Sequence, residues 1–290
     1  YDRQVVFGNG YSPRNYEKSF FGPTTLQVAL EHSRNVVTIL LYKHLLDTDG
    51  ARNIHNRLVD FDLVDGNSWD LAPSDITIAL GSLSITPLEL AAAYIPFVNR
   101  GVGVEPTCLR ELRDKEGRIV RRFKADERVV ISPVSAYQMV HLMRQVVLNG
   151  TGKPVHNYFE ELRAEEPLLP IPKMCGKTGT TNDCTDAWYA GYTPDLVVVV
   201  YMGFDAPRSL GERMSGSYVA SPTWCRIVER VLRLPGHEWK MDFDRPAGIE
   251  FADVDAESGR TLADGARAPS GQALHNVPFK AKTVPPKVSY

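Results

Sequence analysis

Lysine, threonine and glycine follow one another in the segment CGKTGTTNDCTDAW, which begins at Cys175. Gly179 has no Cβ, so the backbone of a ligand can lie against a strand at this position. Thr178 and Thr180 alternate to one side of an expected strand, where their hydroxyls can bind a carboxylate or a carbonyl. Strict alternation directs Lys177 to the opposite face, and a twist or bulge would be needed to bring its charge to the same cleft. The segment predicts one wall of a polar site, although the tripeptide alone is also compatible with a plain bulged strand.

A second candidate is Ser33-Arg34-Asn35, which lies between two expected helices at residues 25–32 and 36–46. The serine places a hydroxyl, and the asparagine an amide, on one short turn. Taken alone, Ser-x-Asn commonly does no more than cap a helix. Its chemical interest depends on whether the fold brings it to the lysine segment.

Helix and strand signals predict an α+β chain, in which an antiparallel sheet is flanked by helices. Helix starts are indicated by Thr86 with Glu89 three residues later, by Ser132 before a proline, and by Ser221 before a proline. Short β-rich runs at 174–181, 187–192 and 196–203 are separated by tight turns, which favours an antiparallel meander. A further hairpin is expected within 102–123, with its turn at 114–117.

Composition excludes several functional classes. Lys+Arg 33 against Asp+Glu 35 gives a net charge of −2, so the chain offers no basic field for nucleic acid. No apolar run approaches the ~20 residues that span a bilayer. The four cysteines lack metal-ligand spacing, so we expect no metal and no cofactor, and buried free thiols rather than disulfides.

The character of the sequence changes after residue 243. Residues 1–243 contain the helix and strand signals, whereas residues 244–290 predict a small hairpin and a loose C-terminal tail. We therefore expect one main domain with an appendage.

In their order along the chain, the two motifs resemble those of the transpeptidase domain of class A (bifunctional) penicillin-binding proteins. Segments 11–41, 78–101 and 176–211 each resemble a part of that domain, and the resemblance covers roughly residues 10–235. It implies the penicillin-binding/β-lactamase-like transpeptidase fold with a helical subdomain. It also implies a serine D,D-transpeptidase that cross-links peptidoglycan stem peptides and binds β-lactams.

The resemblance implies specific roles for site residues. Ser33 would relay a proton to the leaving amine, Asn35 would hold the substrate amide, and Lys177 would polarise Ser33. The substrate would lie against the strand that follows the lysine, where the resemblance assigns binding to Thr178, Gly179, Thr180 and Thr181. We predict that Lys177 and Ser33 lie within hydrogen-bond reach.

Two departures from the family pattern stand out. Residues 153–174 are longer than the usual link to the lysine strand, and we expect a surface insertion there rather than an ordered flap. No serine among the 290 residues has a lysine three places on, so the Ser-x-x-Lys nucleophile motif is absent. We expect that motif upstream of Tyr1, and the chain alone to be inactive.

Two rival functions stay open at this point: a carboxypeptidase or β-lactamase of the same superfamily, and a non-catalytic domain that binds penicillin. By resemblance, a glycosyltransferase domain and the only membrane anchor would also lie upstream, with this domain on the periplasmic face of the bacterial cytoplasmic membrane.

Overall fold

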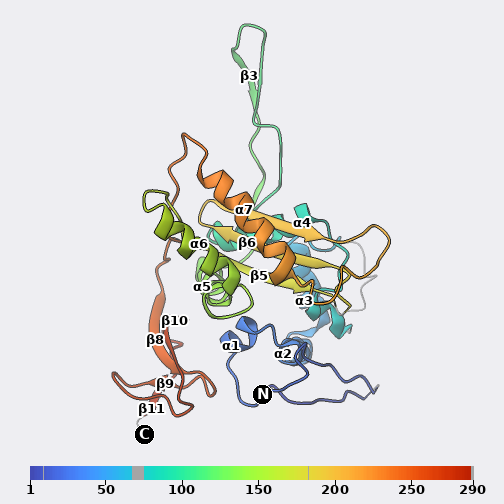
Figure 1. Cartoon of the computed structure of the whole chain (residues 1–290), viewed down its shortest axis with the longest axis vertical. Coiled ribbons are helices and arrows are strands. Elements are labelled where there is room, and N and C mark those ends of the chain that lie inside the picture. Colours follow the sequence, from blue (N-terminus) through green and yellow to red (C-terminus); the bar gives the residue numbers. More distant parts are fainter. Residues whose placement is uncertain (9, 67–74, 182, 289–290) are drawn as a thin grey trace.

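The computed structural model describes residues 1–8, 10–66, 75–181 and 183–288. Helices and strands alternate in blocks along the chain (Figure 1). The helices are α1 Leu26–Glu31, α2 Asn35–Thr48, α3 Gly50–Asp60, η1 Ile76–Leu80, α4 Pro87–Val98, α5 Pro133–Asn149, α6 Lys153–Glu165, η2 Gly216–Ala220 and α7 Ser221–Leu232. The strands are β1 Val102–Val104, β2 Glu111–Arg113, β3 Ile119–Arg122, β4 Glu127–Val129, β5 Cys175–Thr180, β6 Ala187–Thr193, β7 Leu196–Met202, β8 Ile249–Asp255, β9 Thr261–Leu262, β10 Ala273–Lys280 and β11 Lys287–Val288.

The central sheet is the antiparallel meander that the sequence predicts, with strand order β5-β6-β7. Cys175 pairs with Tyr192 and Thr178 pairs with Tyr189, and paired residues share a face of the sheet. Tyr192 and Cys175 pack with residues of α4 and α5, whereas Tyr189 packs with Trp224 of α7. Helices therefore cover both faces of the sheet, and β5 lies at its edge (Figure 1).

The expected helix starts at Thr86 and Ser132 are confirmed. Thr86 accepts from the N–H of Glu89, and the Glu89 carboxylate accepts from the N–H of Thr86, which completes a capping box. Ser132 accepts from the N–H of Ser135 at 3.1 Å. These caps depend on contacts three residues apart, which is why the sequence reveals them.

The expected cap at Ser221 is wrong. The single π-helical turn η2 runs directly into α7, so the chain is already helical at Ala220. The Ser221 hydroxyl instead donates to the carbonyl of Ser217 at 2.7 Å, one helical turn back. The helix therefore begins earlier than the serine-proline signal indicates.

The interpretation of residues 153–174 as a surface insertion is also wrong. α6 buries Val155, Phe159 and Leu162 in the hydrophobic cluster around Trp224. The Phe159 and Trp224 rings meet edge to face, with centroids 6.3 Å apart. Because a buried aromatic and two buried aliphatic side chains lie on one helix face, this segment is part of the core.

The hairpin of β2 and β3 projects from the body of the molecule (Figure 1). Its turn lies at 114–117 as expected, where the N–H of Gly117 donates to the carbonyl of Asp114. Gly117 has a φ of +82°, which a residue without a Cβ adopts at little cost.

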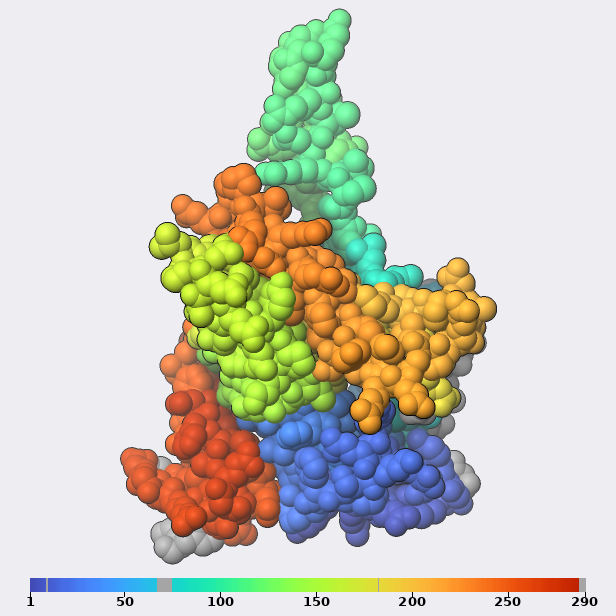
Figure 2. Space-filling model, in the orientation of Figure 1, coloured from blue at the N-terminus to red at the C-terminus, as the bar shows by residue number. Residues whose placement is uncertain are grey.

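Residues 244–288 form more than the expected small hairpin and tail. β8 pairs antiparallel with β10, and β9 and β11 extend this pair to a four-stranded sheet of order β10-β8-β9-β11. The N–H of Thr25 donates to the carbonyl of Ala256 at 3.1 Å, which ties this sheet to the start of α1. In Figure 2 these red residues lie directly beside the blue N-terminal ones.

Among the described residues, all four cysteines are free, and three of them (Cys175, Cys184 and Cys225) are buried. These three cysteines are the buried free thiols that the sequence predicts, whereas the free thiol of Cys108 is exposed. No described helix is both long and apolar enough to cross a bilayer.

Candidate active site

Ser33 lies in the turn between α1 and α2 with a φ of +50°. Its N–H donates to the carbonyl of Leu30 at 3.1 Å, so the turn closes the C-terminal end of α1. The left-handed conformation favours glycine or asparagine at such an end and costs a serine about 1–2 kcal/mol. Strain of this kind is maintained only where the surrounding structure fixes the turn.

The side chain of Arg34 fixes this turn. It is almost fully buried, and its Nε donates to the Asp2 carboxylate at 2.8 Å. Its guanidinium also lies 4.0 Å from the centre of the Phe21 ring. Breaking a buried, hydrogen-bonded ion pair is costly, so the turn has little freedom to rearrange.

Lys177 reaches Ser33 from strand β5. Its Nζ donates to the Ser33 hydroxyl at 2.8 Å and to the carbonyl of Thr178 at 2.8 Å. The predicted contact between these two residues, 144 positions apart, is confirmed. Burial lowers the pKa of Lys177 to about 8, because desolvation disfavours the charged ammonium.

No twist or bulge is needed to bring the lysine to the serine. Lys177 lies two residues after Cys175 in β5 and so shares its face of the sheet, and the Cys175 thiol donates to the carbonyl of Val140 in α5. Lys177 therefore lies on the α5 face of the sheet, and Ser33 is on that side as well. The pairing of β5 with β6 is regular from Cys175 to Thr180.

The hydroxyls of Thr178 and Thr180 lie on the opposite face, at the edge of the sheet. Thr178 donates to the Thr151 hydroxyl at 2.8 Å. Thr180 accepts from the N–H of Gly216 at 3.0 Å. The Ser217 hydroxyl donates to the carbonyl of Thr151 at 2.9 Å and so closes the network. Both β5 hydroxyls are thus oriented by residues outside the strand.

Two glycines allow the backbones to approach this closely. A Cβ on Gly216 would lie 2.2 Å from the Trp188 carbonyl oxygen and 2.6 Å from that of Gly179. A Cβ on Gly150 would lie 2.1 Å from the Glu31 carbonyl oxygen. Side chains of any size are therefore excluded where η2 meets β5 and where the Gly150 segment meets α1.

Thr151, Gly216 and Ser217 were not predicted as site residues. Thr151 has a weak sequence signal, because it lies between Gly150 and Gly152 after a helix. Ser217 has no local signal, since its partner Thr151 is 66 positions away.

Asn35 and Thr181 do not join this network. Asn35 is close to Ser33 in sequence, but its side-chain amide donates to the carbonyl of Arg14 at 3.1 Å. The Thr181 hydroxyl accepts from the N–H groups of Thr185 and Asp186, which closes the turn between β5 and β6. Gly179 lies between the two threonines of β5, against Trp188.

The described residues contain no group of three or more His, Cys, Asp or Glu side chains placed to hold a metal ion. The donor set at the site is one ammonium, hydroxyls and backbone N–H groups. Such groups can bind an anion, polarise a hydroxyl and stabilise a developing oxyanion.

Solved structures share this fold. The chain matches penicillin-binding protein 1A from Haemophilus influenzae with a TM-score of 0.79 at 22% identity, over 100% of this chain and 45% of that one. It matches PonA1 from Mycobacterium tuberculosis, in complex with penicillin V, with a TM-score of 0.64 at 19% identity, over 89% of this chain and 66% of that one. These likenesses establish the penicillin-binding transpeptidase fold.

Curated relatives are more similar in sequence. Penicillin-binding protein 1A of Aquifex aeolicus is 33% identical over 241 residues, which are 82% of this chain and 30% of the relative. That of Pseudomonas aeruginosa is 27% identical over 99% of this chain and 38% of the relative. The chain thus spans about a third of the length of these relatives. Residues 5–229 match the penicillin binding protein transpeptidase domain, and the chain belongs to that family.

Proposed function

We propose that this chain is the Lys-Thr-Gly half of a peptidoglycan D,D-transpeptidase that cross-links stem peptides through a serine acyl-enzyme. The observation that supports it best is the 2.8 Å hydrogen bond from Lys177 to Ser33, at the edge of β5. A partly buried lysine that has no carboxylate partner among the described residues, and that is directed at a serine hydroxyl, is unusual in a purely structural role.

In this proposal Ser33 relays a proton. An acylating serine attacks the D-Ala-D-Ala carbonyl, and the C–N bond breaks as Ser33 gives its hydroxyl proton to the departing D-alanine amine. The proton that the acylating serine loses on attack passes to Ser33 and restores its hydroxyl. Lys177 holds the Ser33 oxygen in place and adds positive potential, while Asn35 would bind the substrate amide after leaving its contact with Arg14. A neighbouring amine then attacks the ester, the bond between the acyl carbon and the serine oxygen breaks, and the proton that the amine loses returns to the released serine.

The two threonines have different freedom to bind a carboxylate. Thr178 already donates its proton to Thr151. Thr180 accepts from Gly216, so its own proton is available to a ligand. We therefore assign the main hydrogen bond to the substrate carboxylate to Thr180, with Thr178 as its support, while Gly179 lets the substrate lie close. The backbone N–H of Thr180 would donate to the oxyanion, a contribution of typically ~2.7–4 kcal/mol. Thr181 stabilises the turn between β5 and β6 and is not assigned a contact with the substrate.

The nucleophile is assigned outside these residues. No Ser-x-x-Lys occurs in the sequence, and Ser33 is followed by Val36 at the position where the lysine would stand. Since the chain spans about a third of its relatives, the nucleophile would come from another part of the same protein. The chain alone would bind a β-lactam without forming a covalent bond.

The substrates and location follow from the same assignment. Stem peptides ending in D-Ala-D-Ala and β-lactams share a carboxylate next to an amide, which the Thr180 hydroxyl and the β5 edge can bind. Peptidoglycan precursors are cross-linked on the periplasmic side of the cytoplasmic membrane, so we place this domain there. Its anchor and a glycosyltransferase domain would lie upstream.

The test is covalent labelling of the full-length protein with fluorescent penicillin. We expect labelling of that protein, at least about 100-fold slower labelling of Lys177→Ala, and unchanged labelling of Lys173→Ala, an exposed lysine near β5. Residues 1–290 alone should give no adduct that survives denaturation. A stable adduct that maps to a serine within residues 1–290 would show that the assignment of the nucleophile is wrong.

A further inference from the structure

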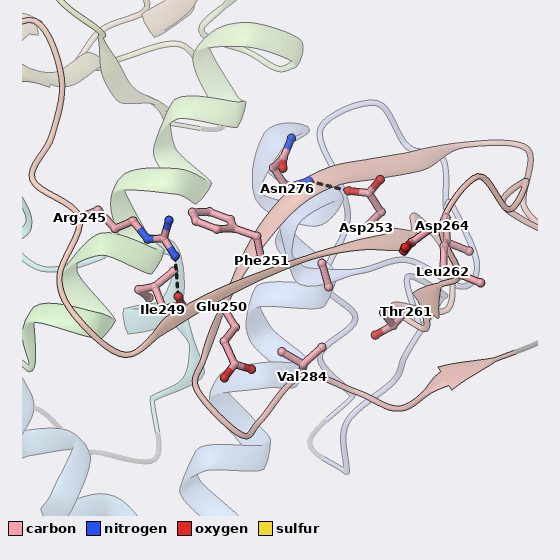
Figure 3. A pocket seen from close by; sticks show the side chains of 12 residues that line it. Arg245, Ile249, Glu250, Phe251, Asp253, Thr261, Leu262, Asp264, Asn276 and Val284 are labelled. Atoms are coloured by element: carbon pink, nitrogen blue, oxygen red, sulfur yellow. Dashed lines mark hydrogen bonds between the residues drawn. The ribbon is translucent and has the colours of Figure 1, made fainter.

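A pocket of about 590 Å³ lies in the C-terminal sheet, remote in sequence from every residue of the candidate active site. One wall is the run of five residues from Ile249 to Asp253 in β8 (Figure 3). The other walls include Thr261, Asp264 and Val284. A wall made of consecutive strand residues presents a strand edge as well as side chains.

No described strand other than β10 pairs with β8 along this wall, so the opposite edge of β8 is open to the pocket. On one side, β8 pairs with β10 from Ile249 to Asp255. On the other side, β9 meets β8 at a single described position, Val254 opposite Thr261. The pocket begins where β9 leaves β8, so it occupies the place that a longer β9 would fill.

Backbone groups of β8 face this pocket. Phe251 is opposite Pro278, which has no N–H, and the Pro278 carbonyl accepts from the Gln138 side chain at 3.1 Å. This pair is therefore one of the non-hydrogen-bonded pairs of the antiparallel ladder, and the N–H and C=O of Phe251 are directed away from β10. Ile249, two residues earlier, has the same orientation, and its carbonyl accepts from Arg245 at 2.8 Å.

The pocket has an excess of negative charge. Among the described residues, its lining contains three carboxylates, Glu250, Asp253 and Asp264, against the single guanidinium of Arg245. Arg245 is already engaged, since it donates to Ile249 and lies 4.5 Å from the centre of the Phe251 ring. The N–H of Asn276, and then the ring of His275, hold the pKa of Asp253 below its usual value, so this carboxylate is ionised at neutral pH.

We propose that this groove binds a short extended peptide with cationic side chains, which adds as a strand to the open edge of β8. Main-chain hydrogen bonds to Phe251 give affinity, and the carboxylates select lysine or arginine on the peptide. The geometry favours a peptide over a small cation, because a small cation cannot pair with the backbone groups of the edge. The charge excludes nucleic acid.

The experiment measures fluorescence anisotropy of a labelled, end-blocked peptide, Thr-Lys-Val-Lys-Thr, with the full-length protein already acylated by penicillin. Two comparison peptides are Thr-Glu-Val-Glu-Thr and the lysine peptide N-methylated at every residue. We expect the lysine peptide to bind at least about tenfold more tightly than either, with a slower exchange of the Phe251 amide when it is bound. The measurement is repeated without penicillin. Because no residue of the candidate active site lines the groove, equal affinity in the two samples keeps the result independent of the proposed function.

Two variants form the matched pair. Glu250→Lys reverses a charge in the groove and is expected to weaken binding of the lysine peptide by about fivefold. Glu257→Lys reverses an exposed charge just beyond β8, outside the groove lining, and should leave binding unchanged. Absence of binding, equal affinity for the N-methylated peptide, or equal effects of the two variants would each overturn the proposal.

Discussion

The N–H of Thr151 donates a 3.0 Å hydrogen bond to the carbonyl of Glu31, and this bond joins the two halves of the site. Glu31 is the last residue of α1, two positions before Ser33. Thr151 supports Thr178 through its hydroxyl. The serine turn and the threonine face of β5 are therefore held in register by one short segment after α5.

Replacement of Gly150 tests that register. A Cβ at this position would lie 2.1 Å from the Glu31 carbonyl oxygen, so Gly150→Ala must push α1 away from the Thr151 segment. We expect a loss of about 1–3 kcal/mol in the free energy of unfolding and slower penicillin acylation of the full-length protein. Denaturant unfolding and labelling rates are the measurements. Gly8→Ala is the control for stability, since that glycine has no neighbour within 4 Å and, like Gly150, has no positive φ. Equal losses for the two variants would show that crowding against Glu31 is not responsible.

The second prediction concerns the charge of Lys177. Burial lowers its pKa from 10.5 to about 8, whereas in the unfolded chain the lysine stays protonated up to about 10.5. Between these values the unfolded state binds the extra proton, so this group makes folding more favourable as the pH rises from about 8 to 10.5. Lys177→Met should remove that slope. Ser33→Ala should lower the pKa of Lys177 further, because Ser33 is a hydrogen-bond acceptor for the ammonium. NMR titration of labelled lysine side chains measures this shift, and an unchanged or raised pKa in Ser33→Ala would contradict it.

The third prediction separates strain from chemistry at Ser33. Its φ of +50° favours glycine, so Ser33→Gly should be more stable than Ser33→Ala by about 1 kcal/mol. Both variants lose the hydroxyl and should acylate equally slowly in the full-length protein. Thermal unfolding and labelling rates measure the two effects. Equal stability of the two variants would mean that the turn is not strained.

The fourth prediction tests the support of the β5 hydroxyls. Ser217→Ala removes the 2.9 Å hydrogen bond to the Thr151 carbonyl without touching β5. We expect acylation by penicillin to slow by about 2- to 10-fold, mainly through weaker initial binding, with little change in thermal stability. Thr223→Ala, which removes a hydroxyl that donates to a carbonyl one turn back in the helix, is the matched control. A loss of stability without a change in acylation would assign Ser217 a purely structural role.

The sequence by itself determined the elements whose signals are local. The capping box at Thr86 and the cap at Ser132 rest on contacts between residues three positions apart, and the three strands of the meander are short β-rich runs separated by tight turns. The structure contains all of them. The motif order and the wider resemblance also identified the family, and with it Lys177 and Ser33 as partners.

Only the tertiary structure decided which residues complete the site. Lys177 lies on the serine side of β5 without a bulge, because α5 and the turn at Ser33 are on the same face. Thr151 and Gly216 support the β5 threonines from 27 and 36 positions away, and no local periodicity encodes such distances. The same reason explains the errors over α6 and the C-terminal sheet, since burial against a distant Trp224 or pairing of β9 with β11 depends on how the whole chain packs.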